Sequence, residues 1–183
     1  MMTPQETPNA PVAAANVFTA SDVEEILREQ GWLLSEASPQ QLAWCERAVL
    51  LLGPHVSDRR SLADLLQFVF HYDAQEILTK VESHSVLARS GARDVVRHLA
   101  LLLLDGAPLT TDRFKEIITA LKDRVGLGSR EIFHPVRLAL AGRAGAGELD
   151  RVILLLDDAA ALSFATPVKS ARERILEFCA ALD

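Results

Sequence analysis

Side chains that could support acid–base, nucleophilic or metal chemistry occur along this chain, but their spacing matches no catalytic or metal-binding pattern. Cys45 and Cys179 are far apart and form no CxxC or Cys/His arrangement, so neither a zinc site nor a disulfide framework is indicated. The histidines have no paired spacing; they are His55, His71, His84, His98 and His134. Carboxylates gather before the C-terminal segment without a partner for proton transfer; they are Glu148, Asp150, Asp157 and Asp158. We therefore predict no catalytic residue, no metal and no cofactor, and we expect a protein that is not an enzyme.

Arginine is the residue type whose placement does suggest a binding chemistry. Between Arg124 and Gly147 there are four arginines and one acid, Glu131, so this stretch carries +3 in a chain of net charge −6. The arginines are Arg124, Arg130, Arg137 and Arg143. A basic strip on an acidic body suits RNA, because phosphates are attracted to the strip and repelled elsewhere. A solvated helix face is the commoner meaning of such a strip when charge alone is considered.

Length and composition indicate a globular domain. The chain has 183 residues, of which 49% are hydrophobic and 24% charged, a balance that supplies enough apolar mass for a core. No GxxxxGK[ST], GxGxxG, HExxH or GxSxG sequence is present, which removes common nucleotide-binding, zinc-hydrolase and esterase signatures. The longest apolar run, residues 99–104, is too short to cross a membrane, and no signal-peptide pattern precedes it. We predict a soluble, cytoplasmic protein with no membrane partner, in which a flexible arm over residues 1–20 precedes one domain over residues 21–183.

Apolar residues recur at three- and four-residue spacing, and no convincing strand pattern occurs, which predicts helices almost throughout. A capping box of Ser21 and Glu24 opens the first expected helix, and Ser38 with Gln41 opens the second. The expected helices span residues 22–30, 39–52, 61–71, 74–81, 85–105 with a break near residue 90, 111–125, 135–141, 148–156 and 166–182. About nine helices make an all-α bundle or helical cage, with helical subdomains over about residues 21–108 and 109–183.

Pro135 is the main irregularity in this helical pattern. Proline lacks a backbone N–H and clashes with the preceding helical turn, but it fits the first turn of a helix well. We therefore expect a short turn over residues 129–133, a break at His134 and a new helix from Pro135 to Ala141.

The segment around this proline is the most specific in the chain. Residues 126–143 read GLGSREIFHPVRLALAGR and are followed by Gly147-Glu148-Leu149 and an apolar helix. The segment resembles the C-terminal anticodon-binding domain of bacterial glutamyl-tRNA synthetases, which carries a glycine-leucine pair, an aromatic residue, Pro-Leu-Arg-x-Ala-Leu-Thr-Gly and a Gly-Pro-x-Leu turn. Upstream, the SLADL sequence from Ser61 and the Tyr72-Asp73 pair are similar to the same family, so the resemblance covers about residues 41–156.

The resemblance implies a helical-cage fold and tRNA, or a tRNA-like RNA, as the partner. It also implies that the chain cannot activate glutamate, because the His-Ile-Gly-His-type and Lys-Met-Ser-Lys-Ser-type signatures of the synthetase catalytic domain are absent. By the same resemblance, Arg137, Ala146 and Leu149 lie against anticodon bases, Arg137 as a planar fork of donors and Leu149 as an apolar platform. The other candidates for RNA contact are Arg124, Arg130, Arg143 and His134.

Two functions remain open at this point. The first is a non-catalytic, stand-alone tRNA-binding module related to glutamyl-tRNA synthetase, which the ordered set of motifs favours. The second is a helical protein-interaction domain that kept the fold and lost RNA binding, with a synthetase or another protein as partner. The net charge of −6 favours the second, as does Gly147 where the family has proline. Trp32 and Trp44 are expected in the core rather than on an RNA surface.

Overall fold

The computed structural model describes residues 17–183; residues 1–16, most of the predicted N-terminal arm, lie outside the described residues. Over the described part of the chain there are eleven α-helices, one 3-10 turn and no strand, so the all-α prediction is confirmed. The elements are α1 (Ala20–Glu29), α2 (Pro39–Leu52), the 3-10 turn Gly53–His55, α3 (Arg59–Phe70), α4 (Ala74–Leu78), α5 (Val81–Leu87), α6 (Ala92–Leu103), α7 (Thr111–Val125), α8 (Ser129–Ala141), α9 (Gly147–Ile153), α10 (Leu156–Ala160) and α11 (Ala171–Leu182).

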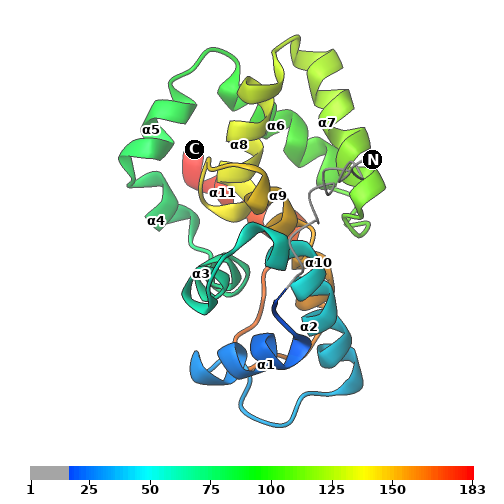
Figure 1. Cartoon of the computed structure of the whole chain (residues 1–183). Helices are drawn as coiled ribbons and strands as arrows, with labels where there is room; N and C mark the ends of the chain where they lie inside the picture. The colour runs from blue at the N-terminus through cyan, green and yellow to red at the C-terminus, as the bar shows by residue number, and fades with distance from the viewer. Residues whose placement is uncertain (1–16) are drawn as a thin grey trace, which may run out of the picture.

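The helices are arranged in two groups, one at each end of the molecule, with further helices between them. In Figure 1, α1 and α2 lie at the lower end and α5 to α8 at the upper end, with α3, α4, α9, α10 and α11 between them. Helix α1 packs along α2, whereas α6 packs against α7, α8 and α11. Buried side chains from both ends belong to one hydrophobic core. The division into subdomains over residues 21–108 and 109–183 stays a prediction, and α6 and α11, from either side of it, pack against each other.

Trp32 and Trp44 lie in the core, as predicted. The Trp32 ring stacks on Phe70 with a centroid distance of 4.6 Å, and the Trp44 ring meets Phe164 edge-on at 5.3 Å. The Trp44 indole N–H donates to the carbonyl of Leu155 at 3.1 Å, which satisfies its one polar atom. This aromatic cluster fixes the lower end of the molecule and leaves neither tryptophan ring available to a base.

Arg174 of α11 is fully buried between the C-terminal ends of α3 and α8. Its guanidinium donates to four carbonyls, those of Phe68 (2.8 Å), Val69 (2.6 Å), Leu140 (3.0 Å) and Lys169 (3.0 Å). No carboxylate of the described residues pairs with it, so the negative ends of two helix dipoles take the place of a counter-ion. Burial lowers the pKa of Arg174 to about 10, which still leaves the guanidinium charged at neutral pH.

Tyr72 closes the same junction from the other side. The guanidinium carbon of Arg174 lies 4.7 Å from the centre of the Tyr72 ring, close enough for a cation–π contact. The Tyr72 hydroxyl donates to the carbonyl of Ala139 at 2.5 Å, and burial raises the pKa of this phenol well above its usual range. The two side chains therefore join α11 to the ends of α3 and α8.

Helix α8 runs without interruption, so the predicted break at His134 is wrong. Pro135 lies inside the helix and is buried. Its missing N–H deprives only the carbonyl of Glu131 of a helical donor, and Glu131 is exposed, so water can satisfy that carbonyl. Burial of Ile132 and Val136 on either side of the proline stabilises the continuous helix.

The first helix starts earlier than predicted. Thr19 is its N-cap, and the Asp22 carboxylate accepts the backbone N–H of Thr19 at 2.8 Å. The predicted Ser21 capping box is therefore wrong, and Glu24 pairs with Arg28 at 2.6 Å instead. Thr19 and Asp22 form the capping box instead, two residues before the predicted one, and satisfy the free backbone N–H groups at the start of the helix.

The last helix starts later than predicted, at residue 171 rather than 166. Ser170 is its N-cap and shares a capping box with Glu173. Ile175 and Phe178 are buried, but Leu176 is 37% exposed and does not face the core. One residue corresponds to about 100° of helical rotation, which carries Leu176 away from the face that holds Ile175.

The buried guanidinium leads to a prediction about stability. Arg174→Met removes the donors of several buried carbonyls, and we expect the free energy of unfolding to fall by about 3–5 kcal/mol. The matched control is Arg172→Met on the exposed side of the same helix, where the Nε donates to the Leu104 carbonyl at 2.9 Å; there the loss should stay below about 1 kcal/mol. Urea denaturation followed by circular dichroism measures both, and equal losses would contradict the role assigned to Arg174.

Candidate nucleic-acid interface

Arg137 of α8 is held by the neighbouring helix rather than presented to solvent. Its Nε and Nη2 atoms donate to the two carboxylate oxygens of Asp150 in α9 at 2.8 and 2.9 Å. Its guanidinium carbon lies 4.7 Å from the centre of the Phe133 ring, and the side chain is only 13% exposed. In this structure Arg137 therefore orients a carboxylate and an aromatic ring, instead of offering a free fork of donors to RNA.

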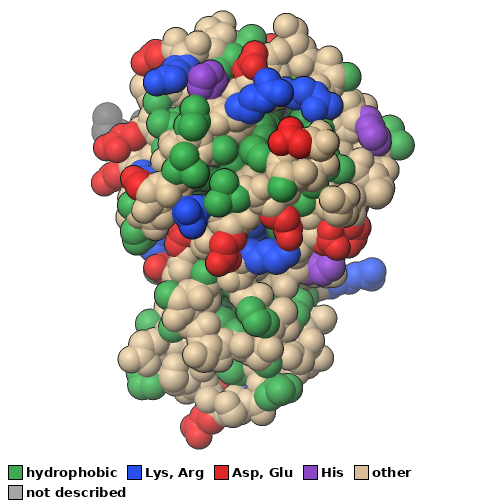
Figure 2. Space-filling model, turned by 180° about the vertical axis from the view of Figure 1, so that it is seen from behind, with side chains coloured by type: hydrophobic (Ala, Val, Ile, Leu, Met, Phe, Trp, Pro, Cys, Tyr) green, Lys and Arg blue, Asp and Glu red, His purple; other side chains and the backbone are tan. Residues whose placement is uncertain are grey.

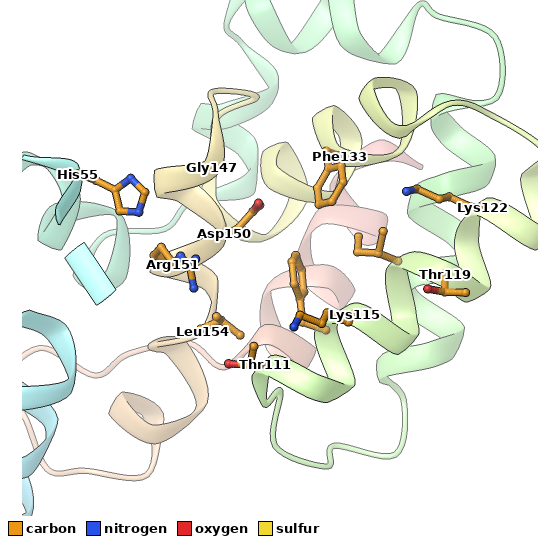
Figure 3. A pocket seen from close by; sticks show the side chains of 12 residues that line it. His55, Thr111, Lys115, Thr119, Lys122, Phe133, Gly147, Asp150, Arg151 and Leu154 are labelled. Atoms are coloured by element: carbon orange, nitrogen blue, oxygen red, sulfur yellow. The ribbon is translucent and has the colours of Figure 1, made fainter. Parts of the chain in front are cut away.

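A groove of about 530 Å³ opens between α7, α9 and the Phe133 ring of α8 (Figure 3). We call it the α7–α9 groove. Its apolar lining consists of Phe114, Ile118, Phe133 and Leu154. Its polar lining consists of His55, Thr111, Lys115, Thr119, Lys122, Asp150 and Arg151. Figure 3 shows the carboxylate of Asp150 directed toward the Phe133 side, with Lys115 and Lys122 on the facing helix. An apolar, partly aromatic floor with cations at the rim suits an unstacked base and its flanking phosphates.

The charges of the α7–α9 groove are predominantly positive and uncompensated. Among the described residues, no carboxylate lies within ion-pair distance of Lys115, Lys122 or Arg151. The Nζ of Lys122 lies 5.9 Å from the centre of the Phe133 ring. Asp150, the one carboxylate that residues 17–183 contribute to the lining, is already neutralised by Arg137. The groove therefore attracts anions although the chain as a whole is acidic.

His134 lies on the same helix, beside the turn between α5 and α6. Arg89 Nη1 is 2.7 Å from His134 Nδ1, and because arginine only donates, this nitrogen accepts and the imidazole is neutral. Burial, and then the positive charges of Arg89, Arg130 and Arg137, lower the pKa of His134. The histidine therefore adds no charge to the surface at neutral pH.

The remaining predicted contact residues are placed by three different segments. Arg124 lies near the end of α7, Arg130 in the first turn of α8, and Arg143 and Ala146 in the loop before α9; all four are exposed. Leu149, in contrast, is 2% exposed and packs against Gly145. A buried Leu149 is not the apolar platform that the resemblance predicted, and the Phe133 side of the groove offers the aromatic surface instead.

The two lysines at the rim of the groove were not predicted. The predicted basic strip spans Arg124 to Gly147 and leaves out Lys115 and Lys122 on the preceding helix. Their positions with Thr119 follow a four- and three-residue spacing, which puts all three on one helical face. From that spacing the shared face of the two lysines could have been predicted. No sequence pattern indicates that α9 lies opposite this face.

The thiols and the acidic clusters of the described residues offer little chemistry. Burial raises the pKa of the Cys45 thiol to about 12, which keeps it protonated. Over residues 17–183, no group of three or more histidines, cysteines or carboxylates is placed to hold a metal ion, and no helix is long and apolar enough to span a membrane.

Comparison with known proteins shows the family of the chain. The family described as "Anticodon binding domain" matches residues 12–163. The chain belongs to this family. Similar curated proteins are glutamate–tRNA ligases: ligase 2 of Syntrophus aciditrophicus is 28% identical over 115 residues, which are 63% of this chain and 23% of that protein. The ligase of Geobacillus stearothermophilus is 27% identical over 130 residues, 71% of this chain and 26% of the ligase. That of Bacillus subtilis is 25% identical over the same shares.

These matches fix the extent of the relationship. The anticodon-binding domain described here spans about a quarter of the length of the ligases that it matches. No solved structure matches the chain. The resemblance noted in the sequence to the anticodon-binding part of glutamyl-tRNA synthetases is confirmed.

The Arg137–Asp150 pair of the anticodon-binding domain should be energetically coupled. Its two side chains are 13% and 20% exposed and form two charge-assisted bonds, so a double-mutant cycle of Arg137→Ala and Asp150→Ala should give a coupling of about 1–2 kcal/mol in the free energy of unfolding. Additive effects of the two substitutions would show that the pair does not organise the site.

His134 should make the stability of the anticodon-binding domain depend on pH. Its pKa is lower in the folded than in the unfolded chain, so unfolded molecules take up a proton first as the pH falls below the ordinary value for histidine. The resulting contribution to stability is present above that value and is lost as the pH falls toward the folded pKa. Urea midpoints measured between pH 7.5 and 5.5 should fall less steeply in His134→Gln than in the wild type; parallel curves would refute the assignment.

Proposed function

We propose that this chain is a stand-alone, non-catalytic tRNA-binding module whose RNA-binding surface is the α7–α9 groove and the adjoining first half of α8. This proposal depends on one combination: three cations, Lys115, Lys122 and Arg151, that pair with no carboxylate of residues 17–183, and an apolar and aromatic floor. Phosphates of an unpaired loop bind the cations, while a base unstacked from that loop covers the floor. Arg124, Arg130 and Arg143 extend the positive surface on the flanking segments.

Arg137 has a different part in this proposal from the one the sequence suggested. It holds Asp150 and Phe133 in place before RNA arrives, so it is a positioning residue and not a direct contact. Leu149 supports the base of the loop from within the core, and Ala146 leaves the loop surface open to the RNA backbone. Family membership supports RNA as the ligand.

A salt-titrated binding assay tests the proposed surface. Wild type and the Lys115→Ala/Lys122→Ala double variant are titrated with total tRNA between about 50 and 200 mM salt. If both lysines contact phosphates, the variant should bind about tenfold more weakly, and its slope of log affinity against log salt should be shallower by about 1.4. The charge-matched control is Arg28→Ala/Arg97→Ala, on α1 and α6 away from the groove.

The control separates two failures. Absence of tRNA binding by the wild type at low salt would overturn the function. Binding that weakens equally in the control would keep the function and remove the groove as its site.

A protein-interaction function is a second candidate, and one observation favours it. Helices α6 and α11 pack together, and leucines on them and at the end of α6 are exposed: Leu101 (60%), Leu104 (47%) and Leu176 (37%). The view from behind in Figure 2 shows hydrophobic side chains among charges of both signs. This function predicts a stoichiometric complex that survives nuclease treatment and weakens in Leu101→Ser, whereas an RNA-binding module would lose its partners together with the RNA.

A further inference from the structure

Asp150 is the only carboxylate in the lining of the α7–α9 groove, within the part of the chain that the structure describes. A carboxylate in an RNA-binding surface is unfavourable next to phosphates, so its presence there calls for a specific role. Each of its oxygens accepts one bond from Arg137, and each carboxylate oxygen has capacity for a second acceptor interaction. The side chain is 20% exposed, so part of this capacity is open to the groove.

Arg137 fixes the position of the Asp150 carboxylate. Arg137 binds both of its oxygens and contacts the Phe133 ring, so the acceptor and the aromatic floor are held by one guanidinium. Figure 3 shows Asp150 directed toward the Phe133 side of the groove. A base that lies over this part of the floor therefore turns one polar edge toward Asp150.

We infer that Asp150 selects, between the two pyrimidines, the unpaired base that carries an exocyclic amino group, so that the groove takes cytosine and discriminates against uracil. This inference rests on the RNA-binding function proposed above. A carboxylate is an acceptor only, and the cytosine amino group is its natural donor among pyrimidines. Uracil offers one N–H between two carbonyl oxygens, so a carboxylate that approaches this edge also meets oxygens that repel it. The positive charge of Arg137 offsets the repulsion between Asp150 and the phosphates. The oxygens of Asp150 can still accept a hydrogen bond from the base.

The test compares two stem-loop RNAs that share a stem and differ in a loop of seven cytidines or seven uridines, with affinity measured by fluorescence anisotropy at low salt. A hydrogen bond to a charged group predicts that the wild type binds the cytidine loop about tenfold more tightly. In Asp150→Asn the preference should fall to near equality, because an amide both donates and accepts. The matched control is Glu148→Gln, which removes the same charge from the same helix outside the groove lining and should keep the preference.

Asp150→Asn also weakens the bond that holds Arg137, so a second measurement leaves the protein unchanged. Wild type is titrated with a loop in which each cytosine is replaced by pyrimidin-2-one, which lacks only the amino group. The inference predicts a loss of about tenfold for this loop. Equal binding of the cytidine, uridine and pyrimidin-2-one loops would overturn the role of Asp150 while the RNA-binding function stands. Failure of the wild type to bind all three loops and total tRNA would overturn both.

Discussion

The buried guanidinium of Arg174 is the constraint on which the rest of this fold depends. A cation taken out of water without a carboxylate partner is costly, and here the cost is offset by carbonyls at the ends of two helices. Those bonds specify where α3 and α8 must end relative to α11, and the Tyr72 hydroxyl adds a second bond to α8. Helix α8 also carries Phe133 and Arg137, so the bonds of Arg174 and Tyr72 to its C-terminal end help to position the candidate site.

This arrangement makes the C-terminal helix part of the working domain. The family match ends at residue 163, whereas Arg174 lies eleven residues further on. The last helix is therefore no appendage, because without it the ends of α3 and α8 would present unpaired carbonyls to the core. At the other face of α8, the Arg137–Asp150 pair performs a similar task on a smaller scale, by fixing an acceptor and an aromatic ring before any ligand binds. Such preorganisation reduces the ordering that RNA binding would otherwise require.

Much of the helical framework was predictable because its signals are local. Ser38 and Gln41 mark the start of α2 through a capping box, as predicted, and Gly126 ends α7 in the left-handed conformation that glycine adopts readily. Pro135 was misread because its local penalty is one hydrogen bond, which burial of the surrounding α8 residues outweighs. Sequence-local preferences show that a proline destabilises a helix, but they do not show the tertiary packing that compensates for this loss.

The candidate site was predictable only in part, for a related reason. The motif located α8 and Arg137, but a sequence cannot show that Asp150, thirteen residues away, already occupies that arginine. Leu149 was expected on the surface, yet the turn before α9 folds it into the core. The groove itself depends on the approach of α9 to α7, and the buried role of Arg174 looks in sequence like any arginine on an amphipathic helix.

Occupation of the α7–α9 groove by RNA can be tested by NMR, through mapping of backbone amide shifts while the protein is titrated with an unlabelled RNA stem-loop. If RNA binds there, we expect salt-sensitive shifts that concentrate on Lys115 to Lys122, Phe133 and Arg151, with α1 and α11 unchanged. Shifts confined to the exposed leucines of α6 and α11, or an unchanged spectrum at saturating RNA and low salt, would contradict it.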